Sequence, residues 1–149
     1  MYSCYVPNGR ALNHPHYVYK LRCLDSLRQL LSQRDPHQAV VLGGDFNIAL
    51  INADVSDPSA FEGSLTCCLR ALLHTDLVNM NPQPSAETTH FTWRDYRSGS
   101  FHRDWGMRID YLFADSLTAQ RFTRVCVDGD ARKGEKPSDH APVVGELTY

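Results

Sequence analysis

The sequence has no hydrophobic run long enough to cross a lipid bilayer, which takes about 20 consecutive apolar residues. Its first residues also lack the basic region and the apolar core of a secretory signal peptide. These two absences argue against a membrane protein or a secreted one. We therefore expect a cytoplasmic location.

Cysteine is present, but not in a pattern that binds zinc or closes a disulfide framework. No pair has the Cys-x-x-Cys or Cys/His spacing of a zinc site, and the number of cysteines is odd. We expect all five to be reduced and mostly packing residues: Cys4, Cys23, Cys67, Cys68 and Cys126.

The chain also lacks a large net charge, since it carries −2 at pH 7 with 42% apolar and 21% charged residues. This composition is ordinary for a single compact domain. Positive charge is nevertheless concentrated in one short segment. That pattern suits phosphate contacts and base stacking, but it also fits an ordinary solvated loop with buried rings. The segment interleaves Arg94, Arg97, Arg103 and Arg108 with Trp93, Tyr96, Phe101 and Trp105.

Helical and extended patterns are mixed along the chain, which indicates an α/β or α+β domain. Leucines at helical spacing, Leu30 among them, predict a helix over residues 17–34. Strands are predicted at 2–6, 39–42, 90–96, 107–114, 122–127 and 143–147. Further helices are predicted at 62–73 and at 116–121, the latter capped by Ser116. Residues 79–88 contain two prolines and are predicted to be an irregular connection.

A carboxylate and an amide follow the buried strand predicted at 39–42, in the stretch 43–47 (Gly-Gly-Asp-Phe-Asn). If the chain is still extended there, period-two alternation puts Asp45 and Asn47 on one face and Phe46 on the other. Ligands commonly bind at such strand exits in open sheets. The alternative is a plain turn with solvated polar side chains.

Two further polar points lie at the edges of predicted strands. Asp110 lies in the 107–114 strand, and Asp139-His140 lies in a loop with a proline on each side. A carboxylate beside an imidazole can orient the ring and raise its basicity, as a general base requires. Asp and Asn oxygens suit Mg²⁺ or Mn²⁺ better than zinc. Each residue alone is more often structural, but together they favour a site for phosphodiester hydrolysis.

Five motifs occur in an order that resembles the exonuclease III family of apurinic/apyrimidinic (AP) endonucleases. They are Tyr-Val-Pro-Asn-Gly, Gly-Gly-Asp-Phe-Asn-Ile-Ala, Thr-Trp-Arg-Asp-Tyr-Arg, Gly-Met-Arg-Ile-Asp-Tyr-Leu and Glu-Lys-Pro-Ser-Asp-His-Ala-Pro-Val. The resemblance implies the endonuclease/exonuclease/phosphatase superfamily and its four-layered α/β sandwich. It also implies Mg²⁺-dependent cleavage of double-stranded DNA 5′ to an abasic site, with 3′-to-5′ exonuclease and 3′-phosphodiesterase activity in DNA repair.

The resemblance assigns roles residue by residue. Asp45 is implied to be the acid/base, Asn47 the amide that stabilises the pentacoordinate phosphorus, and Asp110 the carboxylate that orients His140 at the scissile phosphate. Tyr5 resembles the active-site tyrosine of the family. The implied metal ligands are Asp45, Asn47, Asp139 and His140, for Mg²⁺ or else Mn²⁺, and the implied contacts to DNA are Asn8, Trp93 and Arg97.

Family members begin with a strand that carries an Asn, followed by a segment whose Glu is a principal metal ligand. Nothing before Tyr2 matches either segment. We therefore expect residues 1–149 to correspond to the C-terminal portion of a single domain of this fold, incomplete at the N-terminus. We also expect weak Mg²⁺ binding, little nuclease activity from this chain alone, and self-association through an unpaired sheet edge.

Two other functions stay open. One is a phosphodiesterase or phosphatase of the same superfamily that acts on a lipid, sugar or nucleotide, although the segment 92–97 (Thr-Trp-Arg-Asp-Tyr-Arg) argues against it. The other is an inactive remnant that retains a DNA-binding surface.

Overall fold

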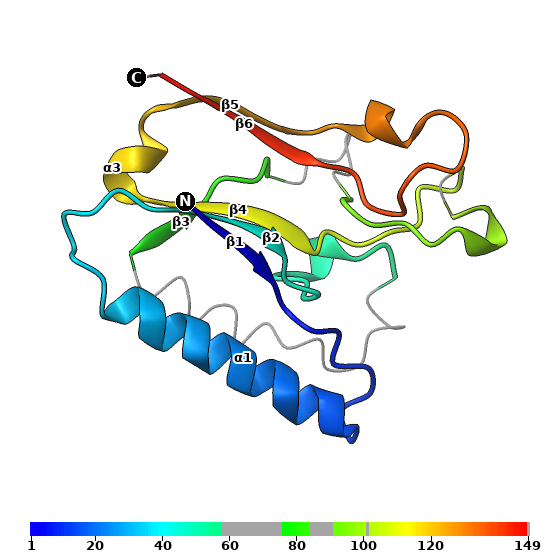
Figure 1. Cartoon of the computed structure of the whole chain (residues 1–149). Helices are drawn as coiled ribbons and strands as arrows, with labels where there is room; N and C mark the ends of the chain where they lie inside the picture. The colour runs from blue at the N-terminus through cyan, green and yellow to red at the C-terminus, as the bar shows by residue number, and fades with distance from the viewer. Residues whose placement is uncertain (58–75, 84–90, 101, 149) are drawn as a thin grey trace.

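The computed structural model describes residues 1–57, 76–83, 91–100 and 102–148, which form two β-sheets and a long helix (Figure 1). The first sheet has the strand order β1-β2-β4-β3, and the second is the hairpin β5-β6. The main elements are β1 (Tyr2–Tyr5), α1 (Pro15–Ser32), β2 (Val41–Asp45), β3 (Leu77–Asn79), β4 (Asp110–Asp115), α3 (Ser116–Ala119), β5 (Phe122–Val127) and β6 (Val143–Leu147). Short 3₁₀ turns occupy Asn52–Asp54, Arg97–Gly99 and Gly129–Arg132.

Helix α1 covers one face of the four-stranded sheet (Figure 1). It begins two residues before the predicted start because Pro15 occupies its first turn and the ring of His14 accepts a hydrogen bond from the His16 N–H. Leu24 and Leu31, seven residues apart, are buried against the sheet. The prediction that Leu30 lies on the buried stripe is wrong, since Leu30 is 52% exposed and is rotated by about 100° from its neighbour Leu31.

The register of the central strands sends aromatic side chains to the helix and acidic ones away from it. Tyr111 and Phe113 belong to the core beneath α1 together with Phe46. Their neighbours Asp110 and Leu112 point to the opposite face, because successive strand residues alternate. In the antiparallel ladder between β2 and β4, Asp110 lies opposite Asp45.

A glycine is required where β1 approaches β2. Gly44 has a φ of +146°, and a Cβ built there would lie 1.8 Å from the carbonyl oxygen of Cys4. Any side chain would therefore push the two parallel strands apart. This explains one of the two glycines that precede Asp45.

The hairpin β5-β6 lies over the other face of the four-stranded sheet (Figure 1). The two layers meet closely at Gly145, where an added Cβ would lie 2.7 Å from the Cδ2 of Leu112. Residues 128–142 connect β5 to β6, and they carry the loop with Asp139 and His140 to the strand ends of the first sheet.

Several predicted elements differ from the structure. Strand β3 lies partly in the stretch predicted to be irregular, and the strand predicted at 90–96 is reduced, over 91–96, to bridges from Trp93 to Met107 and to His140. Strand β4 begins at Asp110, not at residue 107. Asp115, not Ser116, caps α3, because its carboxylate accepts the N–H groups of the first turn. The helix predicted at 62–73 lies outside the described residues.

Strands β5 and β6 match their predicted ranges. Cys4, Cys23 and Cys126 are free thiols, as predicted, whereas Cys67 and Cys68 lie outside the described part of the chain. Among the described helices, none is both long and apolar enough to span a bilayer.

Candidate active site

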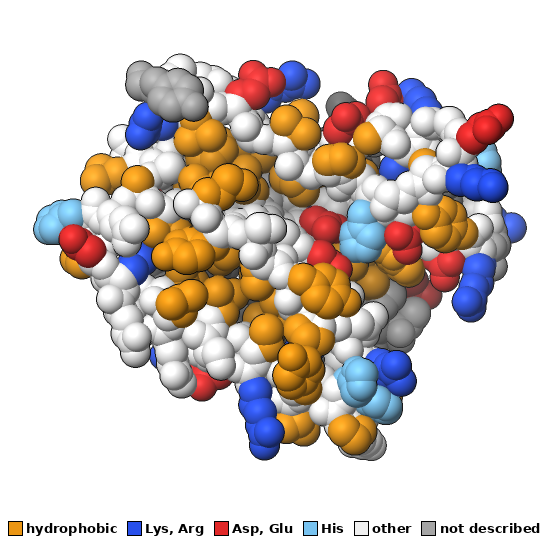
Figure 2. Space-filling view, in the orientation of Figure 1, with side chains coloured by type: hydrophobic (Ala, Val, Ile, Leu, Met, Phe, Trp, Pro, Cys, Tyr) orange, Lys and Arg blue, Asp and Glu red, His pale blue; other side chains and the backbone are white. Residues whose placement is uncertain are grey.

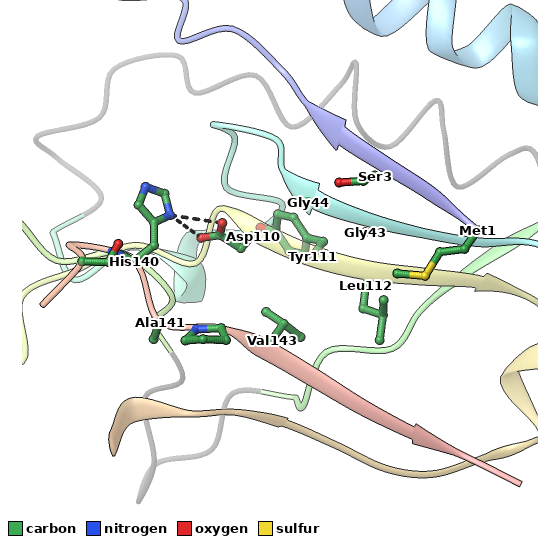
Figure 3. Close-up of a pocket in the computed structure, with 12 residues that line it drawn as sticks. Met1, Ser3, Gly43, Gly44, Asp110, Tyr111, Leu112, His140, Ala141 and Val143 are labelled. Carbon is green, nitrogen blue, oxygen red and sulfur yellow. Dashed lines mark hydrogen bonds and ion pairs between the residues drawn. The ribbon is translucent and has the colours of Figure 1, made fainter. Parts of the chain in front are cut away.

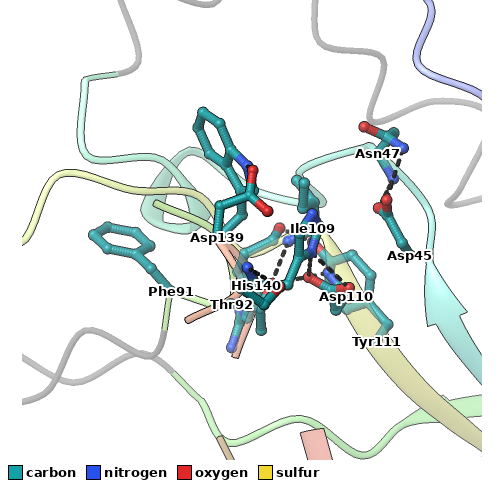
Figure 4. Close-up of polar contacts among 12 residues, drawn as sticks. Asp45, Asn47, Phe91, Thr92, Ile109, Asp110, Tyr111, Asp139 and His140 are labelled. Atoms are coloured by element: carbon teal, nitrogen blue, oxygen red, sulfur yellow. Dashed lines mark hydrogen bonds and ion pairs between the residues drawn. The ribbon is translucent and has the colours of Figure 1, made fainter. Parts of the chain in front are cut away.

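Three ionisable side chains from separate segments meet where the two inner strands of the four-stranded sheet begin or end. Asp45 ends β2, Asp110 begins β4 opposite it, and His140 comes from the loop before β6. One ligand atom from each lies within 4.8 Å of the others. Figure 4 shows Asp110 and His140 in contact, with Asp45 on the neighbouring strand. The predicted convergence of these three residues is therefore present.

Asp110 and His140 form a hydrogen-bonded pair. The Nδ1 of His140 lies 2.9 Å and 3.1 Å from the two carboxylate oxygens of Asp110. The hydrogen bond that Asp110 accepts from the ring raises the pKa of His140, and partial burial of the ring opposes that increase. With Nδ1 held by Asp110, Nε2 is the ring nitrogen left to face a substrate. This is the contact that the sequence predicts.

Asp45 and Asn47 are joined by a turn and not by extended alternation. Asn47 has a φ of +51°, and its backbone N–H donates to the Oδ1 of Asp45 over 2.7 Å. Its side-chain amide donates to the Oδ2 of Asp45 and to the carbonyl of Val6. The side chains do meet, but the predicted reason is wrong, because the left-handed residue brings the amide back over the carboxylate.

Burial raises the pKa of Asp45, and the Asn47 N–H opposes that increase. The nearby Asp110 carboxylate raises it further, while His140 and Lys20 lower it. The carboxylates of Asp45 and Asp110 lie opposite each other on neighbouring strands and repel each other. A bound cation would reduce that repulsion.

Lys20 is a functional candidate that the sequence analysis missed. It lies on α1, is only 5% exposed, and donates from its Nζ to the carbonyl of Asn47 over 2.6 Å. A signal was present in the sequence, since Lys20 lies one turn before Leu24 on the buried stripe of the helix. Its contact supports the turn that joins Asp45 to Asn47.

Asp139 is oriented by the protein toward a different partner. Its Oδ2 accepts a hydrogen bond from the indole N–H of Trp93 over 3.0 Å, and its carbonyl accepts the Arg94 N–H. It is not one of the three residues whose ligand atoms cluster within 4.8 Å. The implied role of Asp139 as a metal ligand stays a prediction.

The segment rich in arginine and aromatic residues divides into a buried part and an exposed part. Arg94 bonds to Asp104 and to the carbonyl of Phe91, and Arg108 forms a buried ion pair with Asp54. The guanidinium groups of these two arginines therefore stabilise the fold, and we do not expect them to contact a ligand. Arg97 and Arg103 are exposed, and the guanidinium of Arg103 lies 5.1 Å from the centre of the Trp105 ring.

The remaining predicted residues lie on the surface or near it. Tyr5 is 67% exposed at the end of β1, where it lies opposite Asp45 in the parallel ladder. Asn8 is exposed in the following turn and accepts the Arg10 N–H. Trp93 is half-buried beside the loop of Asp139. Tyr5 is thus paired in register with Asp45, and Trp93 forms a bridge to His140.

A groove of about 410 Å³ runs from the Asp110–His140 pair along the sheet face (Figure 3). Its other walls are mostly apolar and include Met1, Leu112 and Val143. In the space-filling view, acidic and histidine side chains gather beside hydrophobic ones near the centre of the face (Figure 2). The cluster is thus open to solvent at one end of a groove between the two sheets.

Fold and cluster together define an α/β sandwich with an acid–imidazole site at its strand ends. Residues 3–140 match the model of the Endonuclease/Exonuclease/phosphatase family. The chain therefore belongs to this family.

Known relatives narrow the resemblance to nucleases of the exonuclease III and AP endonuclease type. Exodeoxyribonuclease III of Haemophilus influenzae is 28% identical over 96% of this chain and 59% of that protein. The 3′ phosphatase NExo from Neisseria, solved with a product DNA hairpin, is 33% identical with a TM-score of 0.90, over 99% of this chain and 60% of that one. An AP endonuclease from Archaeoglobus fulgidus is 29% identical with a TM-score of 0.89, with the same coverage.

These comparisons confirm the predicted family and its α/β sandwich fold. The chain spans about 60% of the length of the relatives that it matches. What those longer proteins do is therefore a basis for proposals about this chain.

Proposed function

We propose that this chain carries the acid–imidazole part of the active site of a DNA-repair nuclease of the exonuclease III type. The proposed reaction is Mg²⁺-dependent hydrolysis of phosphodiesters at abasic sites and from 3′ ends. One observation carries the proposal, namely that Asp45, Asp110 and His140 meet within 4.8 Å with Asp110 bonded to the imidazole. A carboxylate-oriented histidine beside a second carboxylate is suited to acid–base chemistry on a phosphate ester.

The donor set fits a divalent cation. Asp45 and Asp110 offer carboxylate oxygens, the ligands that Mg²⁺ prefers, and two protein ligands leave room for the waters that Mg²⁺ retains. Carboxylate and water ligands would suit Mn²⁺ as well. A bound divalent ion would supply positive charge to a substrate phosphate and to the paired carboxylates.

The protein's own groups would divide the remaining work. His140, held by Asp110, would present Nε2 to a phosphate oxygen, and Asp45 would exchange a proton with the attacking water or the leaving oxygen. Both amide hydrogens of Asn47 are used within the protein, so its Oδ1 is the atom that it offers to a ligand. This favours contact of Oδ1 with the cation or with water over a hydrogen bond donated to a phosphoryl oxygen. Tyr5 and Trp93 would flank the substrate.

Double-stranded DNA with abasic or 3′-blocked ends is the proposed substrate. The neighbour from Neisseria is a 3′ phosphatase whose structure holds a product DNA hairpin, and the neighbour from Archaeoglobus fulgidus is an AP endonuclease. On this chain, Asn8, Arg97 and Arg103 are exposed polar or cationic groups available for phosphate contacts.

A phosphodiesterase or phosphatase that acts on a lipid or nucleotide is the second candidate. It is favoured because Arg94 pairs with Asp104 and Arg108 pairs with Asp54. Two of the four arginines in the segment are therefore not available at the surface to bind DNA. The groove with apolar walls next to the cluster is also compatible with a less polar substrate.

A substrate panel separates these candidates. The chain would be assayed alone and as one polypeptide with the part of the Haemophilus influenzae enzyme that lies outside the matched 59%. The substrates would be an abasic duplex, a 3′-phosphate duplex, a phosphoinositide and a nucleoside monophosphate. We expect Mg²⁺-dependent DNA cleavage by the joined protein and little by the chain alone. Preference for the lipid or nucleotide would support the second candidate. A folded joined protein without any hydrolysis would support an inactive remnant.

His140→Ala in the joined protein tests the site itself. We expect cleavage to fall by about 10²- to 10⁴-fold, because that is the usual contribution of an acid–base group. DNA affinity should change much less, since phosphate contacts elsewhere supply most of it. An Asp25→Asn variant, on the exposed face of α1, serves as the control. Equal losses of binding and turnover would mean that His140 only holds the substrate.

A further inference from the structure

Strand β4 extends beyond its neighbour β3 at the end that carries the candidate site. Ladder pairing with β3 covers Phe113 to Asp115 and stops at Asn79. The Leu112 C=O still accepts the Met80 N–H just after β3, whereas the Leu112 N–H and both backbone groups of Asp110 point toward a side where the pairing with β3 has ended. Buried backbone groups must find partners, so other atoms have to replace the strand.

The side chain of Asn81 takes the place of that strand. Its Nδ2 donates to the carbonyl of Asp110 over 2.9 Å, and its Oδ1 accepts the Leu112 N–H over 2.9 Å. One amide thus supplies both the donor and the acceptor that a paired strand residue would offer. Asn81 is 3% exposed, and its own N–H is held by the Oδ1 of Asn79.

Thr92 completes the arrangement from another segment. It is fully buried, and its Oγ1 accepts the N–H groups of Ile109 and Asp110, both over 3.0 Å (Figure 4). Its carbonyl accepts the Ala141 N–H over 2.7 Å. Thr92 is therefore bonded to the backbone of Asp110 and to the residue next to His140.

We propose that Asn81 and Thr92 are positioning residues that hold the Asp110 carboxylate against the His140 ring. They act through the backbone of Asp110, because its N–H bonds to Thr92 and its C=O bonds to Asn81. A catalytic role for this positioning rests on the proposed function, whereas the positioning itself does not. Loss of a buried partner leaves a backbone group unsatisfied, and a displacement of about 1 Å at a reacting group can cost about 10²-fold in rate.

The test compares matched variants of Thr92. Thr92→Val keeps the shape and removes the acceptor, whereas Thr92→Ser keeps the hydroxyl. Thr118→Val is the control, because Thr118 is 5% exposed and its hydroxyl bonds to Asp115 at the other end of β4. Asn81→Asp is a second route, since it keeps an acceptor for Leu112 and removes the donor to Asp110.

The readout is the imidazole ¹⁵N spectrum of His140 in the 149-residue chain, at one fixed pH and without metal, together with the free energy of unfolding. We expect Thr92→Val and Asn81→Asp to weaken the Nδ1–H signature of the bond to Asp110, and Thr92→Ser to retain it. Thr118→Val should lose stability with an unchanged His140 signal. An unchanged signal in both Thr92→Val and Asn81→Asp would overturn the proposal.

Kinetics in the joined nuclease separate this proposal from the proposed function. Thr92→Val should lower kcat by about 10- to 100-fold with little change in KM. If the His140 signal changes in the chain but neither form of the protein cleaves DNA, the positioning stands and the nuclease proposal fails. If kcat falls no more than in Thr118→Val, the two residues support only the fold.

Discussion

At the scale of single residues, the Asp110–His140 pair determines how the site responds to pH. The pKa of His140 is raised by its hydrogen bond to Asp110, so the folded chain favours the protonated ring. The stabilisation is complete below the pKa of the unfolded histidine, near 6.5, and is lost as pH rises through the higher folded pKa. The pair therefore contributes most to stability in mildly acidic solution.

His140→Gln should consequently cost more stability at pH 5.5 than at pH 8.5. Urea unfolding of the wild type and the variant, across that range and in EDTA, measures the difference. In an Asp110→Asn background, the pH dependence of the difference should shrink, because the partner that raises the pKa is gone. A difference that grows with pH would contradict the account.

The site candidates could be predicted from the sequence because each stands at a distinctive place relative to a predicted strand. Asp45 and Asn47 follow a predicted strand, Asp110 lies in one, and His140 lies in a proline-flanked loop just before another. Lys20, Asn81 and Thr92 could not be predicted in this way, since their roles depend on contacts 27, 29 and 18 positions away along the chain. No local pattern distinguishes a buried Asn or Thr that replaces a strand from one in an ordinary turn.

At the scale of elements, hydrogen bonds of the Asp115 side chain connect the C-terminal end of β4 to two neighbouring segments. Its carboxylate accepts the Val40 N–H over 2.6 Å and the N–H groups of Leu117 and Thr118 at the start of α3. Burial alone would raise the pKa of Asp115, but hydrogen bonds from Thr118, Val40 and Leu117 lower it to about 2. One side chain thus joins three segments behind the site.

Asp115→Asn should lower the free energy of unfolding by about 2 kcal/mol at pH 7. Because the folded pKa is depressed, the contribution is present above the unfolded value near 3.9 and is lost as pH falls toward 2. Unfolding curves at pH 7, 4 and 2.5 test this. Asp130→Asn, an exposed carboxylate paired with Lys133, controls for the change in net charge. A loss that persists unchanged at pH 2.5 would contradict the assignment.

Elements with a strong local pattern could be predicted, and those defined by tertiary contacts could not. Strands β5 and β6 each contain valines, joined in β5 by Phe122 and Thr123, and both match the predictions. Strand β3 has three residues, too few for a period to show. Residues 91–96 alternate bulky side chains as a strand would, but Trp93 bonds to Met107 and lies beside His140 across single bridges. Here packing against the loop of Asp139 and His140 overrides the local preference.

At the scale of the whole molecule, the described strands leave β1 at the edge of the sheet. Its register partners all lie in β2. Met1, which precedes β1, is 90% exposed, and Tyr5, the last residue of β1, is 67% exposed. An unprotected edge with apolar neighbours invites pairing with another chain. We therefore predict concentration-dependent self-association, measured by size-exclusion chromatography with light scattering.

Ser3→Lys should reduce this self-association, because a charge on an edge strand opposes pairing. Ser26→Lys, on the exposed face of α1, adds the same charge away from the edge and should leave it unchanged. Equal effects of the two variants would show that net charge, and not the β1 edge, controls association. A monomer at every concentration would contradict the prediction.

Asp45 and Asp110, beside His140, form the proposed site for a divalent cation. It is tested most directly by adding Mn²⁺ to the ¹⁵N-labelled 149-residue chain and observing which amide signals broaden first. Signals near residues 45, 110 and 140 should broaden at the lowest Mn²⁺ concentration, and Asp45→Asn should weaken the apparent affinity by at least about tenfold. Broadening centred on exposed acids such as Asp25 or Asp130, unchanged by Asp45→Asn, would contradict the account.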